Sequence, residues 1–239
     1  MDVGRRLRLL DLYCGAGGCG MGYHMAGFDV VGVDKHPQPR YPFPFVRGDA
    51  LEYVALHGHE YDVIHASPPC QAYSRIENVV RGKFRERSPL RVDLVAQTRA
   101  TLTATGKPYV IENVPGAPLI DPMMLCGLMF GLRVIRHRLF ESNVFMLAPS
   151  HRSHTGVYTN AFAGVSGFRH GATHICVTGN NFIVEDARVA MGIDWMLARE
   201  LTQAIPPAYT RWIGEQLLAY FGSVRSDPTP EGEGVRVWM

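Results

Sequence analysis

The sequence lacks long hydrophobic runs, and their absence argues against a protein with membrane-spanning helices. No apolar stretch approaches the roughly 20 residues that a membrane-spanning helix needs. The basic N-terminus meets Asp11 after only a few apolar residues, which does not fit a signal peptide. We therefore expect no membrane association and a cytoplasmic location, in a bacterium or a phage-infected host cell.

Cysteine is also scarce. The chain has five, an odd number, and their positions show no paired spacing of the kind that metal sites use. Histidine is frequent between residues 142 and 184 but follows no ordered ligand pattern either. We therefore expect reduced thiols, no disulfide framework and no metal. The cysteines are Cys14, Cys19, Cys70, Cys126 and Cys176, and the histidines are His151, His154, His170 and His174.

Lysine is nearly absent: only Lys35, Lys83 and Lys107 appear among 24 basic residues, and the net charge is just +2. Arginine suits phosphates and base edges, but a GC-rich gene gives the same bias, so charge alone does not decide for nucleic acid. A chain of 239 residues with 46% apolar residues can bury one core. We expect one α/β domain and a monomer.

The first motif is a glycine-rich turn between two strands. Residues 7–13 have the pattern of a strand, residues 14–22 are rich in glycine and lead into a helix that ends near Gly27, and residues 28–34 form a second strand that ends in Asp34. This order is typical of nucleotide-binding sites, where the backbone approaches the ligand and the acid binds a ribose diol. The alternative is a tight turn that needs small residues for packing.

Asp49 follows a possible short third strand and precedes a predicted helix over residues 50–57. It is a candidate acceptor for an adenine amino group at the edge of the sheet that Asp34 occupies. The residue type equally favours a helix N-cap, and the two roles are compatible.

Cys70 ends the most informative stretch, residues 61–74, in which a short buried strand runs into a turn fixed by Pro68 and Pro69. Ligands bind at the carboxyl edge of an open α/β sheet. A thiol becomes a nucleophile near neutral pH when its surroundings favour the thiolate. The alternative is an inert, buried cysteine.

Two further segments bring charge to this edge. The strand predicted over residues 107–111 ends in Glu112, and residues 134–141 alternate as a strand, which would place Arg136 and Arg138 on one face. Two like charges on one face need an anionic partner, such as Glu112 or a phosphate. Three strand ends with polar residues argue for a site.

The chain divides into four predicted parts. Residues 1–141 form a catalytic and cofactor-binding core, residues 142–184 a reduced target-recognition region, residues 185–222 a part that returns to the core, and residues 223–239 a disordered tail. Helices are expected over residues 92–105, 185–191 and 205–218. Residues 75–91, which begin with Arg75 and end with Arg91, are a basic loop that either closes as a lid over a polyanion or is a solvated surface loop.

Six of these motifs, in this order, resemble the DNA cytosine-5 methyltransferases. The resemblance is good over residues 7–142 and resumes at residues 185–192 and 203–207. The motifs that carry it are residues 11–18 (DLYCGAGG), Asp34, Gly48-Asp49, Pro69-Cys70-Gln71, Glu112-Asn113-Val114 and the pair Arg136 and Arg138.

The resemblance implies a Rossmann-like fold, S-adenosylmethionine as cofactor, and DNA as partner, contacted by residues 75–91 and 142–184. It implies that Cys70 adds to C6 of a flipped cytosine, that Glu112 shares a proton with N3, and that Arg136 and Arg138 stabilise the carbonyl side of the base and hold Glu112. The residues that would bind the cofactor are Tyr13, Cys14, Gly15, Gly17, Gly18, Asp34, Asp49, Ala50 and Pro68.

The sequence also departs from that family. Val134 stands where a glutamine is usual, Thr202-Gln203 replaces Gly-Asn, and only 43 residues occupy the interval that a large recognition domain fills in typical members. Three alternatives therefore remain: the same chemistry on RNA or a free deoxycytidine nucleotide, a catalytically idle DNA-binding relative, and a variant donor suggested by Lys35 and His36. A phage or restriction-modification origin would fit so compact a chain.

Overall fold

The computed structural model describes residues 5–70, 73, 94–151, 153–157, 166–168, 171–179 and 181–226. Gln71 and the basic loop at residues 75–91 lie outside the described residues, as do parts of the expected recognition region. None of the described helices is both long and apolar enough to cross a lipid bilayer.

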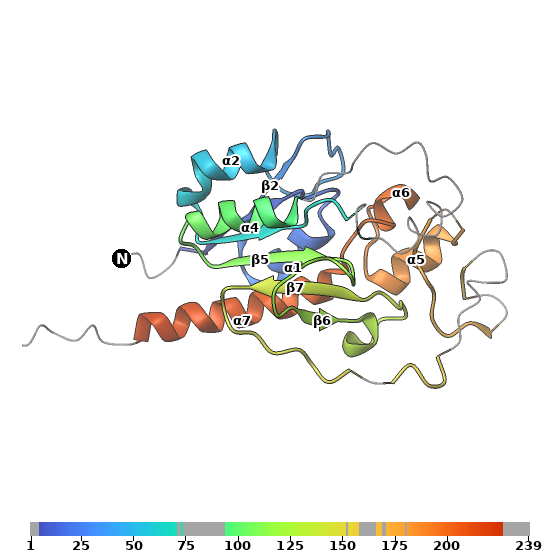
Figure 1. The fold of residues 1–239 in the computed structure, drawn as a ribbon. Helices are drawn as coiled ribbons and strands as arrows, with labels where there is room; N and C mark the ends of the chain where they lie inside the picture. The colour runs from blue at the N-terminus through green and yellow to red at the C-terminus, as the bar shows by residue number, and fades with distance from the viewer. Residues whose placement is uncertain are drawn as a thin grey trace, which may run out of the picture.

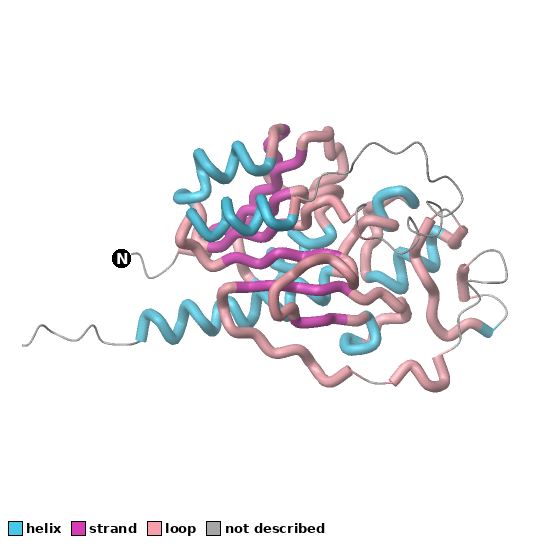
Figure 2. The backbone as a smooth tube through the Cα atoms, in the orientation of Figure 1, coloured by secondary structure: helices cyan, strands magenta, loops and turns pink. Residues whose placement is uncertain are grey.

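A seven-stranded sheet forms the centre of the molecule (Figures 1 and 2). Its order is β3-β2-β1-β4-β5-β7-β6, with β1 to β5 parallel and β7 antiparallel to both its neighbours. The order reverses between β1 and β4, which is where open α/β sheets bind ligands. The strands are β1 (Arg8–Leu12), β2 (Asp29–Asp34), β3 (Phe45–Arg47), β4 (Val63–Ala66), β5 (Tyr109–Asn113), β6 (Met123–Leu125) and β7 (Arg138–Ser142).

Helices cover both faces of the sheet. Helices α1 (Gly18–Ala26) and α7 (Pro207–Ser226) pack together on one face, and α2 (Ala50–His57) and α4 (Val95–Ala104) lie on the other (Figure 1). Successive residues of β1 divide between the two cores, because side chains alternate along a strand. Leu9 packs in the core that contains α1 and α7, and Leu10 packs in the core that contains α2 and α4.

A third core lies near the carboxyl ends of the parallel strands. It includes buried residues of helix α5 (Val184–Met191) and helix α6 (Ala198–Leu201), together with Val134 and Ile175. The indole nitrogen of Trp195 donates to the carbonyl of Ala16 over 2.8 Å, which fastens this core to the glycine-rich turn. Figure 1 shows α5 and α6 beside the ends of the central strands.

Several predicted elements are confirmed. Helix α2 spans residues 50–57 as expected, α1 ends at Gly27 with a positive φ of 121°, and a short β3 precedes Asp49. Helix α7 is longer than expected and continues to Ser226, so its last four residues fall within the predicted tail. Residues 227–239 lie outside the described residues.

The strand predicted over residues 134–141 is wrong in its first half. Strand β7 begins only at Arg138, which pairs with Leu125, the last residue of the three-residue strand β6. Before that point, Val134 forms an isolated bridge with Ile175 instead. Arg136 therefore does not share a strand face with Arg138.

Candidate functional site

The glycine-rich turn brings backbone N–H groups to the end of β2. Gly15 donates its N–H to one oxygen of Asp34 over 3.1 Å, and His36 donates to the other over 2.9 Å. The turn depends on positive φ angles, 57° at Tyr13, 50° at Gly15 and 86° at Gly17. A carboxylate has about four acceptor positions, so Asp34 keeps capacity for a ligand hydroxyl.

The glycines of this motif serve two purposes. A Cβ on Gly15 would meet nothing within 4 Å, so this residue faces open space. A Cβ on Gly17 would lie 2.7 Å from Cδ of Pro42, and one on Gly18 would lie 2.5 Å from the carbonyl oxygen of Ile205. The packing explanation therefore accounts for Gly17 and Gly18, whereas Gly15 is favoured by its left-handed backbone and faces open space.

Asp49 caps helix α2, as one of its two predicted roles required. Its Oδ1 accepts from the N–H groups of Leu51 and Glu52 over 2.9 and 3.1 Å. Both bonds use one oxygen, so within the described residues Oδ2 has no hydrogen bond. The next residue, Ala50, is buried at the start of the helix.

The remaining predicted cofactor residues surround the end of β1 and β4. Tyr13 is half-buried with its hydroxyl 3.5 Å from that of Thr98, and burial raises the pKa of the buried Cys14 thiol. The carbonyl of Pro68 accepts from the side-chain amide of Asn113 over 3.0 Å. This bond joins the turn after β4 to the end of β5.

Cys70 lies in the turn after β4 and is half-buried. Its carbonyl accepts the N–H of Tyr73 over 2.9 Å, which closes a tight turn. Burial raises the pKa of the Cys70 thiol; the Arg138 guanidinium opposes that rise and the Glu112 carboxylate adds to it. The thiol is thus in the electrostatic field of both groups.

Glu112 and Arg138 form a buried ion pair. Nε of Arg138 lies 3.0 Å from Oε1 of Glu112, and their side chains are only 15% and 8% exposed. Burial raises the pKa of Glu112, while Arg138 and a hydrogen bond from the Ser67 hydroxyl hold it down. The expected partnership between an arginine and Glu112 therefore exists for Arg138.

Arg136 makes its hydrogen bonds to backbone carbonyls. Its guanidinium donates to the carbonyls of Val177 and Thr202 over 2.9 and 2.6 Å, and within the described residues its buried Nε has no partner. Its own carbonyl accepts from the Tyr209 hydroxyl over 2.6 Å. Burial lowers the pKa of Arg136 to about 9. Arg136 ties three distant segments together, and a direct role at the base stays a prediction.

A buried polar chain behind Glu112 was missed from the sequence. The Tyr23 hydroxyl lies 2.9 Å from Nδ1 of His65, and Nε2 of His65 lies 3.0 Å from the Ser67 hydroxyl, which reaches Glu112. Burial lowers the pKa of His65 to about 3, so the ring is neutral. Because the Ser67 hydroxyl donates to Glu112, it accepts from Nε2–H of His65, and the other nitrogen of the neutral ring, Nδ1, then accepts from Tyr23. The available signal was a histidine inside an apolar strand.

Comparisons with known proteins place this geometry in context. No protein-family profile matches the chain. It is 31% identical over 126 residues to the type II methyltransferase M.AquIA of Picosynechococcus sp., covering 46% of this chain and 49% of the relative. It is 34% identical over 124 residues to the type II methyltransferase M.XorII of Xanthomonas oryzae pv. oryzae, covering 45% and 28%. The chain thus spans about half the length of the first relative and less of the second.

Two solved structures resemble the fold along nearly the whole chain. The Dnmt2 methyltransferase of S. pombe aligns with a TM-score of 0.62 at 13% identity, over 90% of this chain and 99% of the other. The methyltransferase EhMeth of Entamoeba histolytica aligns with a TM-score of 0.58 at 11% identity, over 94% and 100%. The predicted fold class is confirmed by these likenesses: the chain has the Rossmann-like α/β fold of the methyltransferases.

Proposed function

We propose that this protein transfers a methyl group from S-adenosylmethionine to C5 of cytosine in DNA, through a transient bond between the sulfur of Cys70 and C6 of the base. The observation that carries the proposal is the position of Cys70 at the end of β4, within the field of the buried Glu112–Arg138 pair. The type II methyltransferases matched by the sequence support the same class of reaction.

The chemistry follows from the protonation states of the site. Addition of a thiolate to C6 pushes electrons into the ring, and a proton shared between Glu112 and N3 accepts that charge. Burial raises the pKa of Glu112, which favours a carboxyl group able to share a proton with the bound base. Arg138, fixed against Glu112, is placed to orient the carboxyl group. C5 then takes the methyl group, and loss of the C5 proton allows the Cys70 sulfur to leave.

Glu112 also couples the base to the nucleophile. Its negative charge is one of the causes that raise the pKa of the Cys70 thiol. When Glu112 carries or shares a proton with the base, that cause weakens and the attraction of Arg138 remains. Binding of the base would therefore favour the thiolate at the moment when it is needed.

The residues at the edge of the sheet fit an adenosyl cofactor, which supplies an electrophilic methyl group when bound. Gly15 leaves open space, Asp34 retains acceptor capacity for ribose hydroxyls, and Oδ2 of Asp49, which has no hydrogen bond among the described residues, would accept from the adenine amino group. We assign the cofactor to these residues together with Tyr13, Cys14, Gly17, Gly18, Ala50 and Pro68.

DNA is the proposed partner, with the target cytosine flipped out of the helix, because a stacked base cannot present C6 to a thiol. The proposed contacts are the basic loop at residues 75–91, which lies outside the described residues, and the region at residues 142–184. The short recognition region predicts a short or relaxed target sequence.

The test is methyl transfer from labelled S-adenosylmethionine to duplex DNA, RNA and dCMP, assayed side by side. We expect transfer to DNA that Cys70→Ala abolishes while cofactor binding persists. DNA containing 5-fluorocytosine should trap a covalent adduct, and mass analysis of the product base should show a single added methyl group. Turnover by Cys70→Ala would refute the mechanism, transfer to RNA or dCMP alone would change the substrate, and no adduct would favour an idle DNA-binding relative.

A further inference from the structure

A second cluster of reactive side chains lies next to the proposed active site. One sulfur and three imidazole nitrogens, from Cys126, His137, His151 and His154, all lie within 4.8 Å of one another. Cys126 is buried, His137 and His154 are half-buried, and His151 is exposed. The four residues come from three separate segments of the chain, so the fold and not local sequence brings them together.

Two distances within the cluster match those of a tetrahedral metal site. Nε2 of His154 lies 3.7 Å from Sγ of Cys126 and 3.2 Å from Nε2 of His151. Zinc bonds to sulfur and to imidazole nitrogen, set at tetrahedral angles, would separate a sulfur and a nitrogen by about 3.6 Å and two nitrogens by about 3.3 Å. The observed spacings agree with both values.

Hydrogen bonding alone accounts poorly for this arrangement. A ring nitrogen carries either one hydrogen or one lone pair, so it satisfies one neighbour. Nε2 of His154 faces both the sulfur of Cys126 and Nε2 of His151. The rings of His137 and His154 are also stacked, with centroids 5.1 Å apart. A cation would be bound by all four lone pairs at once.

We propose that Cys126, His137, His151 and His154 bind one Zn²⁺ ion in a structural site. One thiolate and three imidazoles form a ligand set that zinc favours over the harder Mg²⁺ and Ca²⁺. Four protein ligands complete a tetrahedron and leave no open position for water, which distinguishes a structural site from a catalytic one. The sequence analysis expected no metal, and this proposal differs from that expectation.

The position of the site indicates a structural role, because its ligands come from segments that zinc would link. Cys126 follows strand β6, His137 lies between Arg136 and Arg138, and the other two ligands belong to the expected recognition region. Zinc would fasten these segments together just where β7 begins. By holding His137, zinc would also hold the next residue, Arg138. The importance of this for an active site rests on the proposed function, whereas the metal site itself does not.

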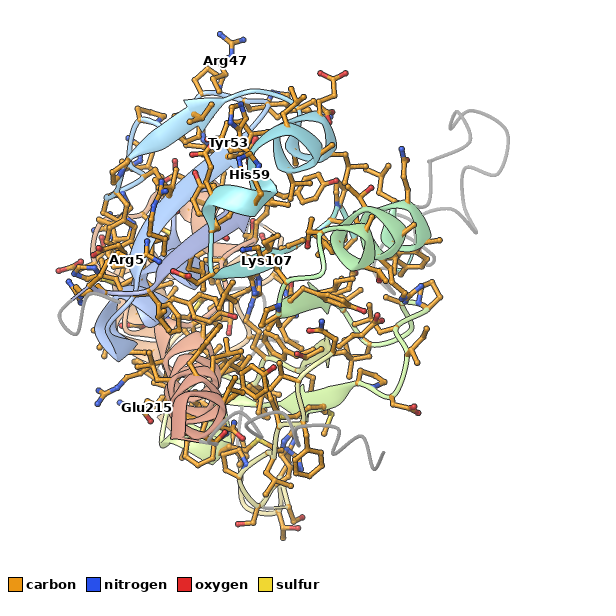
Figure 3. All side chains as sticks on the ribbon, turned by 90° about the vertical axis from the view of Figure 1, so that its left-hand side faces the viewer. Arg5, Arg47, Tyr53, His59, Lys107 and Glu215 are labelled. Atoms are coloured by element: carbon orange, nitrogen blue, oxygen red, sulfur yellow. The ribbon has the colours of Figure 1, made fainter. Side chains whose placement is uncertain are left out.

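The primary test is the zinc content of the full-length protein, purified without chelators and measured by mass spectrometry. We expect about one zinc per chain. The content should fall below about one-tenth of that in Cys126→Ser and in the double variant His151→Ala/His154→Ala. His174→Ala, in the same region, and His59→Ala, on the face that Figure 3 shows, should keep the metal.

Spectroscopy tests the ligand set independently of folding defects. Co²⁺ bound to the wild-type protein should show the intense visible bands of tetrahedral cobalt and a thiolate charge-transfer band. Cys126→His should lose the charge-transfer band and keep the tetrahedral bands, because four ligands remain. Chelation should lower the melting temperature of the wild-type protein, and added Zn²⁺ should restore it.

Three results would overturn the assignment: wild-type protein that binds no zinc, zinc content unchanged in His151→Ala/His154→Ala, or an octahedral cobalt spectrum. Cys70→Ala should contain as much zinc as wild type. Zinc content and methyl transfer are therefore independent measurements, so the zinc result can be interpreted even if the protein transfers no methyl group.

Discussion

Replacing Arg138 by methionine removes one partner of the ion pair at the proposed active site. Methionine has similar length and fills a comparable volume, so the substitution tests charge more than packing. Glu112 would remain buried without its guanidinium, and a buried charge without a partner is strongly unfavourable.

The size of the effect follows from the geometry. The Nε to Oε1 distance is 3.0 Å and the side chains are 15% and 8% exposed. With charge centres about 4 Å apart and an effective dielectric constant of about 20, the attraction is about 4 kcal/mol. Because Arg138 retains some contact with water, we expect Arg138→Met to lower the free energy of unfolding by about 3 kcal/mol.

The loss should depend on pH in a defined direction. Burial already raises the pKa of Glu112 above its ordinary value, and removal of Arg138 would raise it further. A carboxyl group with a raised pKa in the folded state binds its proton more tightly there than in the unfolded chain. Its protonation favours folding at low pH, and this contribution is lost as the pH rises through the folded pKa. The variant should therefore be least stable, relative to wild type, at alkaline pH.

Urea unfolding at about pH 8 and about pH 5.5 measures this difference. Arg211→Met is the matched control, because Arg211 and Glu215 are paired over 2.9 Å but are 52% and 46% exposed. That variant should lose less than about 0.5 kcal/mol at either pH. The double variant Arg138→Met/Glu112→Gln should recover most of the loss, because no unpaired charge remains.

Equal losses at both pH values, or a double variant as unstable as Arg138→Met, would show that packing and not charge makes residue 138 important. A loss no larger than that of the Arg211 control would show that the buried pair contributes little to stability.

Three further predictions concern neighbouring groups. Glu112→Gln should lower the pKa of the Cys70 thiol, because it removes a nearby negative charge, so the rate of iodoacetamide alkylation should rise at lower pH than in wild type; an unchanged profile would contradict the coupling. Burial raises the pKa of Asp11 to about 7. Between pH 5 and pH 8, wild type should therefore lose about 2 to 3 kcal/mol more stability than Asp11→Asn, as measured by thermal unfolding. Parallel curves of stability against pH for the two proteins would refute this. Ser67→Ala should lower kcat for methyl transfer about tenfold with unchanged cofactor affinity, because Glu112 loses its hydroxyl donor. A change in cofactor affinity instead would place Ser67 at the proposed cofactor site.

The parts of the site that follow from local rules could be predicted from the sequence. A strand, a turn rich in glycine and an acid after the next strand lie close in the chain, so the position of Asp34 follows from geometry. Asp49 and helix α2 were predictable because a cap and its helix are adjacent. Cys70 follows β4 and Glu112 lies near the end of β5, and the ends of parallel strands meet at one edge of the sheet.

Arg136 and the histidine cluster could not be predicted, because their partners are remote. The guanidinium of Arg136 binds carbonyls 41 and 66 residues away, and backbone carbonyls leave no trace in a sequence. The pairing of β6 with β7 brings Cys126 and His137 together, and His151 and His154 come from a later segment of the chain. The alternation of residues 134–141 was misleading because strand β6 is too short to extend the pairing.

Helix α7 carries a consequence for synthesis of the protein. Tyr209, Ile213 and Leu217 pack in the same core as Leu9 and Val63, and Thr210 donates to the carbonyl of Cys19 over 2.8 Å. One side of the sheet therefore keeps its apolar residues exposed during synthesis until helix α7 has been made. A chain that stops before Pro207 would leave this apolar face uncovered, and we expect it to aggregate or to bind chaperones.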